Sequence, residues 1–312
     1  MAIFGFILFN NILPIFILAY LGYFLASKFE LDIYTLSKVY IYVFLPGLVF
    51  IQVYTTDINL EFLTALLFAL LLLILLGVMG WFVSKIFNYK VSMSTALNNS
   101  IMFYNCGNFG LPLVMLIFGD TPYDSYAVSV QIMILIVQNI ATFSIGFLNA
   151  GRGQMHYKDT IKKALKMPAL HAVLAAVLFR YININLMDYF FWPSIEYIKD
   201  GMVPVALLTL GIQLYNTKFN LKNWDVYIAS LTRLLGGPIL AYILISIMGI
   251  EGVMAQVLFI SSSVPSAVNT ALIAVEFDNE PDFASQVVMT STILSAVTLT
   301  GVIYFSQYLY SI

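Results

Sequence analysis

Residues 105–113 read NCGNFGLPL, and they interrupt an otherwise apolar stretch that runs from about residue 91 to residue 118. Asparagines, glycines and a proline here weaken a helix at the point where it would be deepest in a membrane. Hydrocarbon penalises unpaired backbone, so such a segment survives only where protein or a water-filled cavity surrounds it. We therefore predict an interrupted transmembrane helix that lies inside the protein.

A second stretch has the same character in the other half of the chain. Residues 253–277 read VMAQVLFISSSVPSAVNTALIAVEF, apolar at both ends and polar around Pro265. Paired interrupted membrane helices, one in each half of a chain, are typical of the binding site of a secondary transporter. The alternative is that the small residues only allow helices to pack closely, as they often do in membranes.

The composition indicates an all-α polytopic membrane protein. Hydrophobic residues make up 61% of the 312 residues and charged residues only 10%, whereas a soluble domain carries roughly 25% charged residues. No basic tail suggests a nucleic-acid partner. The single Cys106 excludes an internal disulfide, and no Cys/His cluster indicates a metal site. We expect no cofactor, and the lipid bilayer is the expected surrounding.

Apolar runs of roughly 20 residues, the length that crosses a bilayer, predict ten transmembrane helices. Their approximate limits are residues 4–26, 33–54, 60–86, 92–118, 124–148, 161–181, 195–216, 224–248, 252–276 and 283–309.

Basic residues test that count independently, because lysine and arginine collect in cytoplasmic loops. Of the 14 lysines and arginines, 11 lie in loops that follow odd-numbered spans, and only Arg180 and Lys199 follow even-numbered ones. This pattern places both termini outside.

Five spans in each half reverse the orientation of the second half, so any repeat must be inverted. Pro112 and Pro265 are 153 positions apart, close to half of the chain. We therefore predict two inverted five-helix repeats, residues 1–150 and 151–312, in which the broken fourth and ninth helices cross.

The breaks suit an anion. The N-terminal ends of half-helices carry partial positive charge and free N–H groups, and Asn105, Asn108 and Asn269 add neutral donors beside them. No acidic residue lies near either proline, and Glu276 is about 16 Å along a helix from Pro265. These features favour an organic solute over a bare cation.

Three further polar residues lie within predicted spans. Arg233, in LTRLLGGPIL, could attract a substrate carboxylate, or it could snorkel inward or pair with Glu276 or a helix-end carbonyl. Gln138 and Asn139 are explained by hydrogen bonds between helices, although Asn139 could line the same cavity as the first break.

Several segments resemble the auxin efflux carrier family, which includes plant auxin exporters and bacterial carriers of malonate, malate and other small carboxylates. They are NNSIMFYNCGNFGLPL, PGLVF after Leu45, VPVALLTLGIQL, RLLGGP and VPSAVNTALIA. The long hydrophilic loop of many plant members is replaced by a short basic turn at residues 151–166, so the chain resembles the bacterial branch or a short PIN-like form.

The resemblance implies that the fourth and ninth helices cross at their prolines, Pro112 and Pro265. It also implies a scaffold of helices 1, 2, 6 and 7, often dimeric, and a transport domain of helices 3–5 and 8–10 that moves as an elevator in a bacterial inner (plasma) membrane. It implies no chemistry on the substrate. The candidate substrate-binding residues are Asn105, Gly107, Asn108, Pro112, Asn139, Arg233, Ser263, Pro265 and Asn269.

The leading functional hypothesis is a secondary active efflux carrier of a small organic anion, such as an indole acid or a dicarboxylate. The alternative is a sodium-coupled symporter or antiporter of the bile-acid-transporter type, for which Ser261, Ser262, Ser263 and Asn269 could supply oxygen ligands. A receptor or an intramembrane enzyme is a third class, but the sequence shows no nucleophile and base together at mid-membrane.

Overall fold

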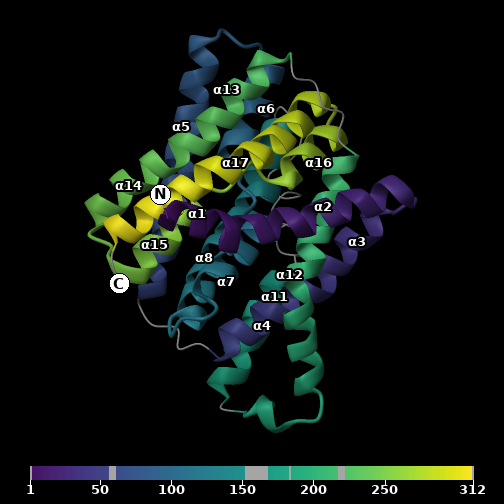
Figure 1. Cartoon of the computed structure of the whole chain (residues 1–312), viewed down its shortest axis with the longest axis vertical. Helices are drawn as coiled ribbons and strands as arrows, with labels where there is room; N and C mark the ends of the chain where they lie inside the picture. The colour runs from purple at the N-terminus through teal and green to yellow at the C-terminus, as the bar shows by residue number, and fades with distance from the viewer. Residues whose placement is uncertain (1, 56–60, 152–167, 183, 217–221, 311–312) are drawn as a thin grey trace.

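The computed structural model describes residues 2–55, 61–151, 168–182, 184–216 and 222–310, and in these residues the chain is helical apart from turns and one isolated β-bridge. Figure 1 shows α4, α11 and α12 toward one end of the molecule and α5 and α13 toward the other. The helices are α1 (Ala2–Ile7), η1 (Leu8–Ile12), α2 (Leu13–Lys28), α3 (Ile33–Val39), η2 (Tyr40–Phe44), α4 (Leu45–Thr55), α5 (Glu61–Ile86), α6 (Val91–Met102), η3 (Cys106–Gly110), α7 (Leu111–Phe118), α8 (Asp124–Ala141), η4 (Thr142–Gly146), α9 (Phe147–Ala150), α11 (Pro168–Tyr181), η5 (Leu186–Asp188), α12 (Trp192–Tyr215), α13 (Trp224–Leu231), η6 (Thr232–Gly236), α14 (Gly237–Met248), α15 (Gly252–Ser261), α16 (Val268–Glu276) and α17 (Pro281–Leu309).

Six of the described helical stretches are long and apolar enough to cross a membrane, as a polytopic membrane protein requires. They are Gly5–Lys28, Thr35–Thr55, Leu63–Ile86, Asp124–Ala150, Trp224–Met248 and Pro281–Leu309. Shorter apolar helices accompany them at Cys106–Phe118, Pro168–Tyr181 and Gly252–Ser261. The count of ten spans stays a prediction, because the first residues of the span predicted at 161–181 and much of the preceding basic turn lie outside the described residues.

Helix α12 differs from the six in its first three turns, which contain Glu196, Lys199 and Asp200. Charged side chains at this density belong at the membrane surface rather than in its core. The apolar part of the span predicted at residues 195–216 starts near Gly201, and the bounds of that span stay a prediction.

Helices α2 and α12 are in very close contact. A Cβ atom placed on Gly211 would overlap the backbone carbonyl of Ala19, and one placed on Gly22 would overlap the backbone of Leu208. Two glycines facing each other's backbones are the common means by which membrane helices approach closely. Helices α4 and α11 pack against each other beside this pair.

The first predicted break exists, but it does not lie at Pro112. Helix α6 ends at Met102, and the non-helical residues 103–105 separate it from η3 and α7. Pro112 lies within the continuous helical stretch Cys106–Phe118, directly after the π-helical η3, so it alters hydrogen bonding inside that helix and does not separate two helices. The expectation that the helices cross at both prolines is therefore wrong for Pro112.

The second break does contain its proline. Helix α15 ends at Ser261, α16 begins at Val268, and Pro265 lies in the turn and extended segment between them. This arrangement matches the predicted interruption of residues 252–276.

The two breaks lie against each other and form an isolated antiparallel β-bridge between Tyr104 and Ser266. The N–H of Asn105 donates to the carbonyl of Pro265 at 2.8 Å, and the N–H of Ala267 donates to the carbonyl of Phe103 at 2.9 Å. Each break thus satisfies backbone groups of the other, which is how non-helical backbone persists at membrane depth.

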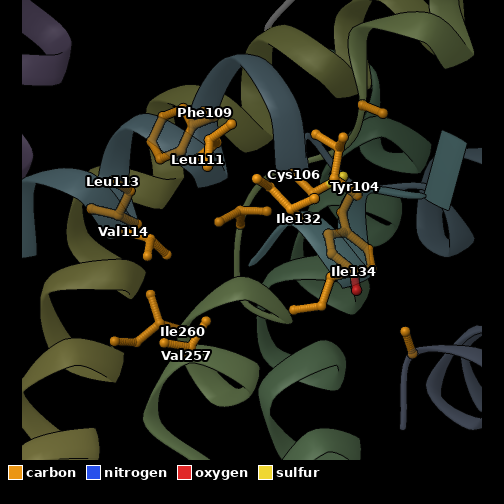
Figure 2. Packing of buried hydrophobic residues seen from close by; sticks show 14 of the residues in the cluster. Tyr104, Cys106, Phe109, Leu111, Leu113, Val114, Ile132, Ile134, Val257 and Ile260 are labelled. Carbon is orange, nitrogen blue, oxygen red and sulfur yellow. The ribbon is translucent and has the colours of Figure 1, made fainter. Parts of the chain in front are cut away.

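Apolar side chains pack densely around the first break. Figure 2 shows Tyr104 and Cys106 beside Ile132 and Ile134 of α8, with Val114 facing Ile260 and Val257 of α15. The crossing is therefore enclosed by protein rather than by lipid.

Candidate substrate site

A cavity of about 90 Å³ lies next to the two breaks. Residues of η2, η3, α8, η4, α12 and α16 contribute to its wall. No acidic or basic side chain is among the described residues that line it, and its polar side chains include Tyr40, Asn105, Asn108, Gln138, Asn139 and Asn269. The site is neutral, so it must bind a ligand through dipoles and hydrogen bonds.

The N-terminal ends of both distal half-helices open into this cavity. Cys106, Gly107 and Asn108 in the first turn of η3 line it, and so do Val268 and Asn269 in the first turn of α16. Helix α16 begins without a side-chain cap. The first N–H groups of a helix have no partner within the helix and carry partial positive charge, so the cavity is electropositive without a basic residue.

Two amide side chains are held so that their NH₂ groups remain available. The Oδ1 atom of Asn105 accepts a hydrogen bond from the N–H of Asn108 at 3.2 Å, and the Oε1 atom of Gln138 accepts from the N–H of Tyr104 at 3.4 Å. Their Nδ2 and Nε2 atoms are buried and have no hydrogen-bond partner among the described residues. Because the oxygens are already occupied, the donor end of each amide is the part left for an acceptor.

Tyr40 supplies a third buried polar group at the same wall. Its hydroxyl is also without a partner in the described part of the chain. A Cβ atom on Gly107 would lie 3.0 Å from that hydroxyl, so the glycine leaves space beside it. A buried donor without an acceptor costs about 1–3 kcal/mol, which a bound acceptor would recover.

The structure brings together five of the nine predicted site residues, namely Asn105, Gly107, Asn108, Asn139 and Asn269. The other four do not line the cavity. Pro112 is the second residue of α7, the carbonyl of Pro265 accepts the N–H of Asn105, and the hydroxyl of Ser263 donates to the carbonyl of Phe259 at 2.7 Å.

Arg233 is fully buried beside the crossing but outside the cavity wall. Its Nη1 atom donates to the carbonyl of Ile101 at 3.0 Å, and its Nη2 atom donates to the carbonyl of Ser262. The guanidinium carbon lies 4.6 Å from the centre of the Tyr104 ring. Of the alternatives open from the sequence, pairing with helix-end carbonyls is the one observed.

Two cavity residues carried no clear signal in the sequence. Gln138 was interpreted as a hydrogen-bonding residue between helices, and only the position of the Tyr104 N–H shows which end of its amide is free. Tyr40 is one of 20 tyrosines, and nothing in its neighbourhood along the chain distinguishes it.

A larger cavity of about 400 Å³ adjoins the first and shares lining residues with it, including Ile41, Gln213 and Val268. Its wall is mostly apolar and includes Ala271, Leu272 and Val275 of α16. The exposed Lys38 is the basic residue at its rim. We refer to this larger cavity as the vestibule.

Comparison with known proteins gives a consistent result. A family model described as "Membrane transport protein" matches residues 7–303. An uncharacterized transporter of Methanocaldococcus jannaschii is 25% identical over 304 residues, which is 93% of this chain and 96% of that protein. A protein of Rhizobium meliloti named "Putative malonate transporter" is 25% identical over 311 residues, 94% of each chain.

Proposed function

The chain belongs to the membrane transport protein family, and on that premise we propose that it is a secondary active carrier of a small organic carboxylate. Membership agrees with the resemblance to the auxin efflux carriers, and relatives named as transporters indicate a transporter rather than an enzyme. An integral membrane location follows from the family and from the apolar helices.

The observation that carries the proposal is the set of donors without acceptors. The amide NH₂ groups of Asn105 and Gln138 and the hydroxyl of Tyr40 are buried without partners among the described residues, and all three residues line a cavity into which two helix N-termini open. A carboxylate is acceptor-only, with about four lone-pair sites, and so complements such a wall. A bare cation would find donors where it needs oxygen lone pairs.

The two cavities differ in size and polarity, which suggests that different parts of one substrate molecule occupy them. The smaller cavity suits a carboxylate head, and the mostly apolar vestibule suits an apolar body. A second carboxylate in the vestibule would lose hydration against a mostly apolar wall, whose polar residues are Ser37, Lys38, Gln213, Asn216 and Ser285. A monocarboxylate with an apolar body is therefore our preferred substrate class over a short dicarboxylate.

We further propose the ten-helix architecture of two inverted five-helix repeats, with helices α2, α4, α11 and α12 as part of the scaffold and the interrupted helices in a moving domain. The cavity supports this division, because Ser37, Tyr40 and Gln213 come from the proposed scaffold and the other polar groups from the proposed moving domain. Elevator-type alternating access, a homodimer, a plasma-membrane location and external termini belong to this proposal.

Uptake into proteoliposomes tests the function. Labelled indole acids, aliphatic monocarboxylates and malonate are compared in media with and without sodium. Accumulation of a carboxylate above protein-free liposomes supports the carrier. Failure of every carboxylate to enter or to exchange would contradict it, and preference for malonate would reassign the substrate class.

Substitution of Ala271 by tryptophan tests the role of the vestibule. Because Ala271 lies in the vestibule wall and not in the smaller cavity, an indole there should obstruct large substrate bodies. We expect transport of an indole acid to fall at least about tenfold, and that of a two-carbon acid by less than about twofold.

Competitive uptake of the two acids measures this selectivity. Val297→Trp is the matched control, because Val297 is 70% exposed on α17 and should tolerate the same side chain. Equal inhibition of both acids by Ala271→Trp would show that the vestibule does not hold the substrate body.

A further inference from the structure

We propose that Arg233 is a permanently bound cation at the helix crossing, which neutralises the C-terminal ends of both proximal half-helices and makes transport independent of sodium. The inference rests on the proposed function only in that its first test measures transport. Carriers with broken helices commonly bind their coupling cation at unwound carbonyls and half-helix C-termini. Here a guanidinium already binds two such carbonyls.

Arg233 donates to one of the carbonyl groups at the C-terminal end of α6. The carbonyl of Ser100 accepts the hydroxyl of Ser266 at 2.7 Å, and the carbonyl of Phe103 accepts the N–H of Ala267 at 2.9 Å. Between them, the carbonyl of Ile101 accepts Nη1 of Arg233 at 3.0 Å. Without the arginine, that buried acceptor loses this bond.

The carbonyl groups at the C-terminal end of α15 also accept hydrogen bonds, one of them from Arg233. The N–H of Ser263 donates to the carbonyl of Ile260 at 3.0 Å, and the N–H of Val264 donates to the carbonyl of Ser261 at 3.3 Å. The next carbonyl, that of Ser262, accepts Nη2 of Arg233. One planar guanidinium thus joins two helix ends that are far apart in the sequence, and its fork geometry suits this double contact.

The charges balance. Each half-helix C-terminus carries about half a negative elementary charge, so two of them offset about one positive charge. Arginine stays protonated in proteins, and the face of the Tyr104 ring at 4.6 Å adds a cation–π contact. A buried charge is expensive in a membrane unless it is compensated, and this one has two helix ends and an aromatic ring. A sodium ion at the same carbonyls would meet a fixed positive charge.

Gly237 leaves the space in which the guanidinium of Arg233 reaches the carbonyl of Ser262. It lies one helical turn after Arg233, and a Cβ atom there would clash with Nη2 of Arg233 and with the carbonyl of Ser262. The segment RLLGG therefore contains both the cation and the space that it needs. Because the residues after Ile101 carry Tyr104 and Asn105 into the cavity wall, Arg233 is a positioning residue for the substrate site.

The first test uses the wild-type carrier in proteoliposomes, with choline replacing sodium at a fixed membrane potential. The expected rate changes by less than about twofold. A loss of about tenfold or more without sodium would overturn the inference while leaving the carrier function intact. If no carboxylate is transported in either medium, the proposed function fails, and a substrate-free measurement decides the role of Arg233.

That measurement is the melting temperature of purified Arg233→Ala in detergent. We expect a decrease of at least about 5 °C, largely reversed by millimolar methylguanidinium but not by sodium or choline at the same concentration. Arg180→Ala is the matched control, since Arg180 is only partly buried and donates to the carbonyl of Val53 at 3.1 Å; methylguanidinium should not raise its melting temperature. Equal rescue by sodium, or none by methylguanidinium, would refute a built-in cation.

If Arg233→Ala does not fold, Arg233→Lys and Arg233→Met replace it. The two side chains are similar in length, but only lysine keeps the charge. The Lys variant should melt clearly above the Met variant. A Met variant that melts at or above the Lys variant would show that the charge is not needed at the crossing.

Discussion

Replacement of Asn105 by aspartate is expected to lower carboxylate transport at least about 100-fold while the protein still folds. The reason is that aspartate keeps the oxygen that accepts the N–H of Asn108 but loses the buried Nδ2 donor. A like charge about 4 Å from the substrate costs about 4 kcal/mol at an effective dielectric constant of 20. Tenfold corresponds to about 1.4 kcal/mol, so a 100-fold loss requires only part of that repulsion.

Initial rates of proteoliposome uptake, normalised to folded protein by size-exclusion chromatography, measure the effect. Asn223→Asp is a matched control, because the Oδ1 atom of Asn223 caps α13 by accepting the N–H of Asp225 at 3.2 Å and Asn223 does not line the cavity. That variant should transport within about twofold of wild type. Wild-type transport by Asn105→Asp would show that the amide does not contact the anion.

The presence of the two breaks could be predicted from the residues themselves, because asparagine, glycine, serine and proline are poorly suited to a helix in hydrocarbon. The location of the first break could not. Residues 103–105 include Phe103 and Tyr104, which show no preference for a helix break in this context. Their extended backbone is stabilised by hydrogen bonds to Pro265 and Ala267, and such a partner is visible only in the folded chain.

Some residues of the candidate site could likewise be predicted from the sequence, and others could not. Asn105, Asn108 and Asn269 could be identified because amides beside a break are uncommon in apolar spans. Tyr40 comes from another helix, and its role depends on its approach to Gly107. The role of Arg233 depends on the carbonyls of Ile101 and Ser262, which belong to two other helices. The roles of Tyr40 and Arg233 therefore depend on contacts between segments that are distant in the sequence, and local composition does not reveal these contacts.

The close contact of α2 and α12 leads to the second large expected effect, which is on folding. Gly211→Ala should lower the melting temperature by at least about 5 °C, whereas Gly301→Ala in α17 should leave it unchanged or raise it slightly. Both substitutions gain about 1 kcal/mol of helix propensity, so the difference between them isolates the packing term. A Cβ atom at Gly301 would have no neighbour within 4 Å, but one at Gly211 would overlap the carbonyl of Ala19.

The overlap at Gly211 cannot be relieved by a side-chain rotation, because both groups are fixed to helix backbones. Helices α2 and α12 must separate instead, and overpacking of this kind typically costs about 1–3 kcal/mol or more. Separation would also move Gln213, two residues later in the cavity wall, so the transport rate per folded molecule should fall as well. Thermal unfolding of both variants in detergent, with uptake measured on the folded fraction, tests this. Equal melting temperatures for Gly211→Ala and Gly301→Ala would mean that the two helices are not in backbone contact.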